Sequence, residues 1–218
     1  MPRRVLALFA KAPVPGAVKT RLAPELGDER AAALYEAMLL DVLDQHAREP
    51  DCALALWFTP DGAADWFAAH APPAYRRIPQ RGADLAERMR AAFEVHGAEG
   101  FDRIALRGTD SPTLPAARIG EAFAALDHFP AALCPDRDGG YNLIALREPH
   151  ARLFELELSH GRVLGATLAR ARELGLACEL LPSHHDVDTW NDLVRLGAEL
   201  DPARTPRTLA FHRSLTPR

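Results

Sequence analysis

The chain has 218 residues and a formal net charge of −4 at pH 7, with 48% hydrophobic and 26% charged residues. This balance is typical of a soluble globular domain, and the mixed charge argues against a non-specific nucleic-acid binder. The apolar runs are far shorter than the roughly 18 residues that cross a bilayer, and the N-terminus lacks the long apolar core of a signal peptide. We therefore expect a cytoplasmic protein with no membrane span and no nucleic-acid partner.

Apolar periodicity predicts strands that alternate with helices along the chain. The expected strands cover residues 5–10, 52–58, 103–106, 131–135, 141–146 and 178–181. The expected helices begin at Asp28 and after Asp84, and three more cover 116–126, 163–174 and 190–200. The helix after Asp84 is expected to place Leu85, Met89 and Phe93 on its inner face.

This alternation predicts an α/β fold with an open, mostly parallel sheet and helices on both faces. We expect residues 1–200 to form a single domain and 201–218, with three prolines and four arginines, to form a C-terminal tail. Ligands bind such sheets at the carboxyl ends of the strands, so the loops there are where chemistry is expected.

The first of these loops contains both lysines of the chain. Of 26 basic residues 24 are arginine, and the two lysines, Lys11 and Lys19, lie in one loop that also holds Arg21. An ammonium is a compact point charge that a planar guanidinium does not always replace. Cations between a strand and a helix suit phosphate groups, although the loop matches neither the Walker nor the Rossmann glycine pattern. A solvated basic loop is the structural alternative.

Aspartates follow two other strands. Asp110 comes directly after the strand at 103–106, where a carboxylate is well placed to hold Mg²⁺ or Mn²⁺. Asp186 and Asp188 share one face if their segment is extended, and they could complete that metal site. The alternatives are helix caps, with Asp110 capping one helix and Asp188 or Thr189 capping the last.

The segment around Asp138-Gly139-Gly140 is a hairpin turn signal. Its glycines would also let backbone approach a sugar or phosphate, with Asp138 and Asn142 available to bind hydroxyl groups. The neighbouring pair His184 and His185 is interpreted as loop histidines, since no further ligand lies at zinc-site spacing in the sequence.

Four segments together resemble the nucleotide-diphospho-sugar transferases of the GT-A fold, a Rossmann-like α/β fold. The segments are FAKAPVPGAVKTRL at 9–22, GTDSP at 108–112, DGGY at 138–141 and DVDT at 186–189. The chain looks most like the bacterial branch called DUF2064, which is associated with glycosyltransferases and arsenosugar biosynthesis. It is also similar to 2-phospholactate guanylyltransferases, although Tyr141 replaces the threonine that many of them carry after the glycines.

The resemblance implies roles for these residues. Lys11, Lys19 and Arg21 match the nucleotide-phosphate loop, and the turn with Gly139, Gly140, Tyr141 and Asn142 would complete substrate binding. Asp110 matches the position that binds a divalent cation, Mg²⁺ or Mn²⁺, with Asp186 or Asp188 as the second carboxylate. The catalytic carboxylates would be Asp110 and Asp138, the latter as acceptor-binding group or general base.

We therefore expect a metal-dependent glycosyltransferase that uses a nucleotide-diphospho-sugar donor and a small-molecule acceptor. A nucleotidyltransferase that uses a nucleoside triphosphate and releases pyrophosphate needs the same cations and carboxylates, so these residues do not separate the two reactions. The acceptor pocket, expected near residues 80–85 and after Tyr141, would separate them. A non-catalytic nucleotide-binding protein is the third alternative.

Overall fold

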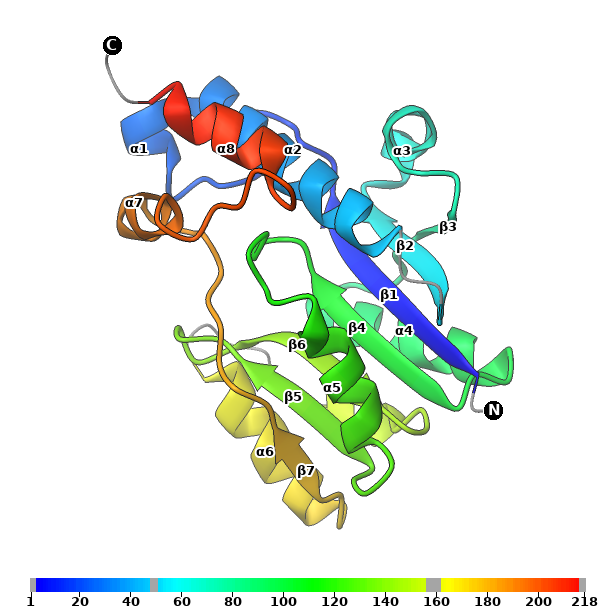
Figure 1. Ribbon diagram of the computed structural model, residues 1–218. Coiled ribbons are helices and arrows are strands. Elements are labelled where there is room, and N and C mark those ends of the chain that lie inside the picture. The colour runs from blue at the N-terminus through cyan, green and yellow to red at the C-terminus, as the bar shows by residue number, and fades with distance from the viewer. Residues whose placement is uncertain (1–2, 48–50, 156–161, 216–218) are drawn as a thin grey trace.

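The computed structural model describes residues 3–47, 51–155 and 162–215, and its centre is a seven-stranded sheet. The strand order is β3-β2-β1-β4-β6-β5-β7 (Figure 1). Only β6 runs antiparallel to its neighbours, β4 and β5. The strands are β1 (Arg4–Lys11), β2 (Ala53–Thr59), β3 (Tyr75–Pro79), β4 (Arg103–Gly108), β5 (Ala131–Pro135), β6 (Tyr141–Leu146) and β7 (Cys178–Leu180).

Helices cover both faces of the sheet, as the alternating pattern predicts. They are α1 (Ala23–Leu26), α2 (Asp28–His46), α3 (Ala64–His70), α4 (Leu85–Ala98), α5 (Ala117–Ala125), α6 (Val163–Glu173), α7 (Trp190–Leu196) and α8 (Pro206–Arg213), with short 3₁₀ turns η1 (Asp61–Ala63) and η2 (Ala151–Phe154).

Strand β1 separates two hydrophobic cores because successive side chains of a strand point to opposite faces. Leu6 and Leu8 contribute to the core that includes α2, α3 and α5, whereas Ala7 and Phe9 contribute to the core that includes α4, η2 and α6. Burial on both faces explains why the β1 sequence is continuously apolar.

The order of the strands creates a topological switch point between β1 and β4. From β1 the chain adds β2 and β3 on one side, and it then returns to place β4 on the other side of β1. Helices α1, α7 and α8 gather beyond the end at which β1 and β4 stop (Figure 1). The loops after β1 and β4 therefore leave the sheet side by side, which is where open α/β sheets bind ligands.

Helix α7 lies at this end of the molecule because its first turn is capped and its inner face is apolar. The Thr189 hydroxyl accepts from Asp192 N, and the Asp192 carboxylate accepts from Thr189 N. Leu193 and Leu196 join Val187 in a third apolar cluster with residues of α2. The structure thus confirms Thr189, one of the two expected candidates, as the N-cap of this last-predicted helix.

The structure confirms each expected strand and helix to within a few residues, and it adds the short helices α1 and α3, which were not expected. There are three further differences. Strand β3 was not expected, because its Arg76 and Arg77 are exposed and break the apolar alternation of an edge strand. Leu85 is 52% exposed, so its expected place on the inner face of α4 is wrong. As the first residue after the Asp84 cap it points outward, and Ala86 is buried instead.

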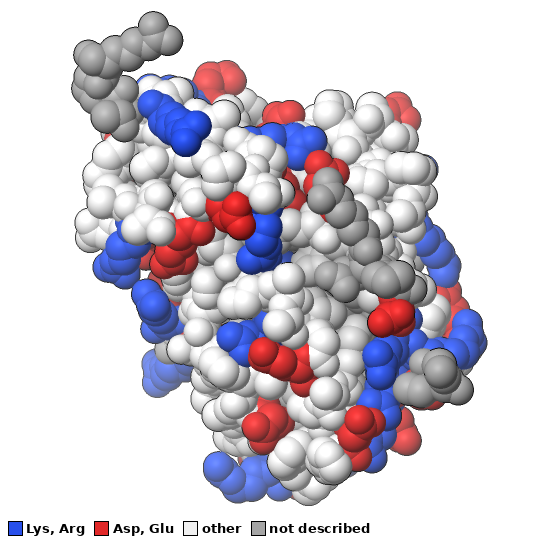
Figure 2. Space-filling model, in the orientation of Figure 1, with Lys and Arg blue, Asp and Glu red and all other residues white. Residues whose placement is uncertain are grey.

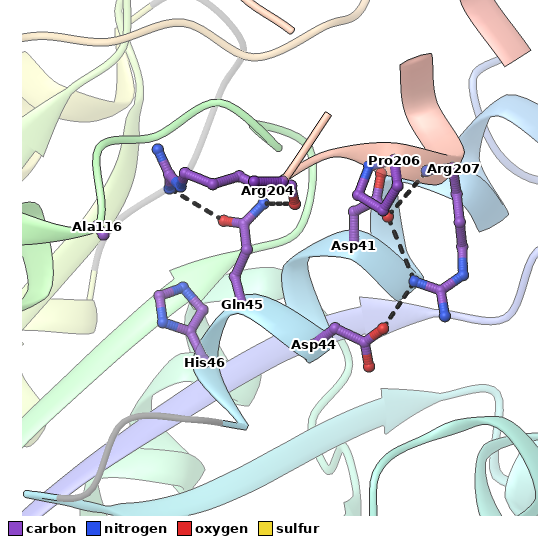
Figure 3. Close-up of a pocket in the computed structure, with 9 residues that line it drawn as sticks. Asp41, Asp44, Gln45, His46, Ala116, Arg204, Pro206 and Arg207 are labelled. Carbon is purple, nitrogen blue, oxygen red and sulfur yellow. Dashed lines mark hydrogen bonds and ion pairs between the residues drawn. The ribbon is translucent and has the colours of Figure 1, made fainter. Parts of the chain in front are cut away.

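The C-terminal segment contains a third difference, because Pro206–Arg213 forms α8, which lies along α2. Beneath it is a cavity of about 140 Å³ between α2 and the segment that leads into α8 (Figure 3). Gln45 spans this joint: its amide donates to Arg204 O and accepts from the Arg204 guanidinium. None of the aspartates and cations singled out in the four loops lines this cavity.

Charged side chains are spread over the face of the molecule seen in Figure 2. Basic and acidic groups alternate there, and neither sign forms a continuous patch. In the described part of the chain, no helix combines the length and the apolar character needed to cross a membrane.

We predict that Asp41→Ala detaches α8. The Asp41 carboxylate is fully buried and accepts from Thr208 N, at 2.8 Å, from the Thr208 hydroxyl, at 2.7 Å, and from Arg207 N, at 3.2 Å. Its loss leaves buried donors unpaired, at a cost of about 3 kcal/mol. The thermal unfolding midpoint should fall by about 8 °C.

Asp44→Ala is the matched control for that experiment. Asp44 lies one turn away and pairs with the same Arg207, at 2.7 Å, but its side chain is 43% exposed. An exposed ion pair contributes less than about 1 kcal/mol, so the midpoint should change little. Equal shifts in the two variants would contradict this account of how α8 is held.

Candidate functional site

The loop after β1 returns a lysine side chain to the interior. Two tight turns, with Val14 N bonded to Ala12 O and Ala17 N to Val14 O, follow the strand. Val18 and Leu22 are buried on either side of Lys19, and they anchor the loop there. Lys19 itself has a φ of 48°, a left-handed conformation that costs energy for any residue but glycine.

The Lys19 ammonium lies between two aspartates from distant loops. Its Nζ contacts Asp110 Oδ1 and lies 3.0 Å from Asp188 Oδ1. The Lys19 side chain is 3% exposed, whereas those of Asp110 and Asp188 are 39% and 40% exposed. One buried cation thus joins the loop after β4 to the segment before α7, and solvent still reaches both carboxylates.

The charges around Lys19 shift its pKa and that of a third aspartate. Burial alone would lower the pKa of Lys19, but Asp110 and Asp188 outweigh it and hold the pKa above the usual value. Burial, followed by the charges of Asp110 and Asp136, raises the pKa of Asp186. Lys19 therefore stays charged at neutral pH, in a site that holds more negative than positive charge.

The other two cations of the first loop remain accessible. Lys11 ends β1 with an exposed side chain, and its backbone N–H donates to the Tyr35 hydroxyl. Arg21 is 60% exposed and lies 3.7 Å from Asp138 Oδ2 and 3.8 Å from Asp188 Oδ2. The expected phosphate cations thus divide into one buried charge, Lys19, and two exposed charges.

The turn at 136–140 is a hairpin turn, as its sequence indicates. Asp136 N donates to Gly140 O at 2.9 Å, and Gly139 adopts a φ of 85° that favours glycine. Asp138 is 64% exposed on this turn. Asp136 holds the turn against the segment that contains Asp186 and Asp188, because its Oδ1 accepts from Asp186 N at 3.1 Å.

Tyr141 and Asn142 begin β6, where the ladder with β5 is irregular. The register shifts between Cys134 and Pro135, so that Asn142 has no opposite residue. Such bulges redirect side chains and are frequent beside active sites. Tyr141 contacts the core of α4 and α6, whereas the Asn142 amide is buried with neither polar atom bonded to any described residue. An unpaired buried amide is costly, which makes Asn142 a candidate for ligand binding.

The carboxylates around Lys19 are of the class that holds a divalent cation. Asp110 and Asp188 are partly exposed, and Asp186 Oδ1 is buried without a hydrogen-bond partner among the described residues. Hard oxygen ligands of this kind suit Mg²⁺ or Mn²⁺. The chemistry of these oxygen donors therefore suits such an ion, but the three carboxylates are not gathered within 4.8 Å of one another, and the Lys19 ammonium lies between Asp110 and Asp188.

The sequence analysis did not predict the buried groups that hold the Asp110 loop from the protein interior. Arg107 is fully buried in β4, where its guanidinium contacts His46 Nε2 and donates to Ser111 O. Burial and the charge of Arg107 lower the pKa of His46 to about 2, so His46 is neutral. An arginine inside an apolar strand run was the signal that could have identified this support.

The hydroxyl of Tyr35 is a second missed support. It lies 3.1 Å from the Thr109 hydroxyl and accepts from Lys11 N at 3.0 Å, which joins the loops after β1 and β4. In the sequence, Tyr35 belongs to the apolar face expected for the helix that begins at Asp28. Nothing in the sequence shows that its hydroxyl reaches the carboxyl ends of β1 and β4.

The fold and this site together define a class, the α/β transferases with the nucleotide-diphospho-sugar transferase fold. The chain belongs to the family described as "uncharacterized protein conserved in bacteria" (DUF2064), whose profile matches residues 42–157. It is 32% identical over 203 residues to 3-phospho-D-glycerate guanylyltransferase from Phenylobacterium zucineum (strain HLK1), covering 88% of this chain and 89% of the relative.

Solved structures agree with this assignment. A candidate nucleotide-diphospho-sugar transferase from Desulfovibrio desulfuricans G20 superposes with a TM-score of 0.89 at 32% identity, covering 98% of this chain and 95% of the other. A 4-diphosphocytidyl-2C-methyl-D-erythritol synthase superposes with a TM-score of 0.62 at 14% identity, covering 92% and 100%, which is a likeness of fold alone. The relatives are transferases, and the expected family and fold are confirmed.

We predict that Lys19→Arg destabilises the protein although it conserves the charge. A guanidinium is wider than an ammonium, and the space between Asp110 and Asp188 is closed to solvent on the lysine side. Forcing a larger group into a packed site costs about 2 kcal/mol, which would lower the unfolding midpoint by about 5 °C.

Arg21→Lys is the control for this substitution, because it makes the reverse exchange at an exposed position two residues away. Surface exchanges of this kind usually change stability by less than about 0.5 kcal/mol. An unchanged midpoint in Lys19→Arg would show that the buried site does not require a point charge.

Proposed function

We propose that the protein is a nucleotidyltransferase that joins the nucleoside monophosphate of a triphosphate to a small phosphorylated acid. The guanylyltransferase relative, which matches 88% of the chain, carries this proposal and makes GTP and 3-phospho-D-glycerate the first substrates to test. This choice differs from the glycosyl transfer expected from the sequence, which rested on the family resemblance and on Tyr141.

The reaction requires little covalent chemistry from the protein. An oxygen of the acceptor phosphate attacks the α-phosphorus of the triphosphate, the bond from that phosphorus to the β-bridging oxygen breaks, and pyrophosphate leaves with the bonding electrons. Catalysis of such transfers depends on alignment of the groups and neutralisation of their charge. Lys11 and Arg21 are exposed in the loop at the carboxyl end of β1, where they are suited to contact the phosphates.

Lys19 has a different part in this proposal. Because it is buried between Asp110 and Asp188, it positions these carboxylates rather than reaching freely into solvent. Asp110, Asp186 and Asp188 are the residues that would hold a divalent cation, which would supply neutralisation of the phosphate charge. Without the Lys19 ammonium, these carboxylates would repel one another.

An acceptor that is already ionised removes the need for a general base. A phosphate oxygen carries negative charge at neutral pH, whereas a sugar hydroxyl must lose a proton during transfer. Asp138, the expected base, is 64% exposed and faces Arg21, so it lacks the buried setting of a tuned base. We assign Asp138 to holding Arg21, and Asn142, whose buried amide is unpaired, to acceptor binding.

Glycosyl transfer from a nucleotide-diphospho-sugar remains the second candidate. It is favoured by the Desulfovibrio desulfuricans protein, whose description is that of a nucleotide-diphospho-sugar transferase and whose backbone is closely similar. The two reactions release different products, since nucleotidyl transfer yields pyrophosphate and glycosyl transfer yields a nucleoside diphosphate.

We predict pyrophosphate release from GTP with Mg²⁺ and 3-phospho-D-glycerate, and none when the acceptor is omitted. Asp110→Asn should reduce the rate by about 100-fold or more, because it removes a carboxylate from the charge-neutralising site. An enzyme-coupled pyrophosphate assay, repeated with ATP, CTP and UTP, measures this directly. Release of nucleoside diphosphate from a nucleotide sugar, with no pyrophosphate from any triphosphate, would refute nucleotidyl transfer in favour of glycosyl transfer.

A further inference from the structure

A second group of potential ligands lies away from the Lys19 site. His184 and His185 directly precede Asp186 and Asp188 in the segment before α7, and Glu199 follows α7. One ligand atom from each of these three residues lies within 4.8 Å of the others. This is the one such group of three or more histidine, cysteine, aspartate or glutamate side chains in residues 3–47, 51–155 and 162–215.

The contacts within this group are short but leave ligand atoms available. His185 Nε2 lies 3.6 Å from Glu199 Oε1, just beyond a hydrogen bond. His184 Nε2 lies 3.2 Å from the Thr113 hydroxyl, which donates to Glu199 Oε2 at 3.1 Å. The two imidazole rings are tilted against each other, with centroids 4.8 Å apart, and each has a nitrogen close to the Glu199 carboxylate.

His185 has a feature that is unusual for a histidine in a protein core. It is only 4% exposed, and neither of its ring nitrogens has a hydrogen-bond partner among the described residues. Buried polar atoms are almost always paired, since an unpaired one costs free energy. A partner that binds to the ring nitrogen would remove that cost.

The backbone around these ligands is held in place before any ion binds. His184 N donates to Pro135 O at 3.0 Å, and Asp186 N donates to Asp136 Oδ1 at 3.1 Å. Glu199 N donates to Leu196 O at the end of α7. Only side-chain adjustments are then needed to bring three donors to the spacing of about 3.3 Å found around a tetrahedral ion.

We propose that His184, His185 and Glu199 bind one transition-metal ion of the Zn²⁺ class. Two imidazoles and a carboxylate are ligands that zinc accepts in proteins, with a solvent molecule as the fourth. The site differs in class from the carboxylate site at Asp110, which suits hard ions such as Mg²⁺. This proposal does not rest on the proposed nucleotidyl transfer.

Such an ion would cross-link two segments next to the Lys19 site. It would tie the end of α7 to the loop that continues into Asp186 and Asp188, beside Thr113 of the loop after β4. The proposed role is therefore structural, in that the ion fixes the segment from which two of the Lys19-site carboxylates project.

The test is metal binding by the whole protein, after dialysis against a chelator and then against metal-free buffer. Zn²⁺ is titrated in competition with a chromophoric chelator, and Co²⁺ is titrated while its visible absorption is recorded. We expect one Zn²⁺ per chain with a dissociation constant below about 1 µM. The Co²⁺ spectrum should have the intense bands of a tetrahedral ion rather than the weak bands of an octahedral one.

Three variants assign the site. Glu199→Gln and His184→Ala should each weaken Zn²⁺ binding by about 100-fold, because each removes one of only three protein ligands. His128→Ala, at an exposed histidine outside the site, should bind Zn²⁺ as the wild type does. Glu199→Gln is the main variant, since Glu199 is exposed and its amide substitute has the same shape, so the fold should persist.

Stability provides a second readout that does not depend on activity. Excess Zn²⁺ should raise the unfolding midpoint of the wild type by about 5 °C, and it should not raise that of Glu199→Gln. Absence of Zn²⁺ binding by the wild type would overturn the proposal. Binding that is equally tight in Glu199→Gln and His184→Ala would also overturn it, because the ion would then lie elsewhere.

Discussion

The arrangement of the candidate site depends on one buried ammonium. Lys19 is 3% exposed, has a strained backbone conformation, and contacts aspartates that lie 91 and 169 residues further along the chain. Removing a charge from water is costly, and here the cost is offset by two carboxylates that share it. In return, the ammonium holds Asp110 and Asp188 together and keeps them from repelling one another at the edge of the sheet.

The sheet topology is what makes that contact possible. The switch point places the loops after β1 and β4 next to each other, and β6, running antiparallel, returns the 136–140 turn to the same edge. Polar side chains then hold these loops together. Buried Tyr35 joins the loops after β1 and β4, and partly buried Asp136 joins the 136–140 turn to the segment that contains Asp186. A site built this way rests on strands rather than on its loops alone, which keeps its charged groups in place.

Much of the fold could be predicted because its signals are local. Apolar runs such as 5–10 and the capped start of α4 define their elements by themselves, whereas edge strand β3 carries little apolar pattern. The site was predicted less completely. The sequence identified Lys19, Asp110 and Asp188, but not that Lys19 is buried between the two aspartates, since pairing across 169 residues leaves no trace in spacing. The same is true of Glu199, which turns two loop histidines into a potential metal site.

The proposed function requires that the loops around Lys19, at the carboxyl ends of β1 and β4, bind a nucleoside triphosphate. The most direct measurement is the thermal shift of wild type and Asp110→Asn with GTP and with GDP-sugars, each in the presence and absence of Mg²⁺. We predict that GTP with Mg²⁺ raises the wild-type unfolding midpoint by about 5 °C or more, and that Asp110→Asn largely loses this effect. A shift with a GDP-sugar but not with GTP, or no shift with any of the nucleotides, would contradict this prediction.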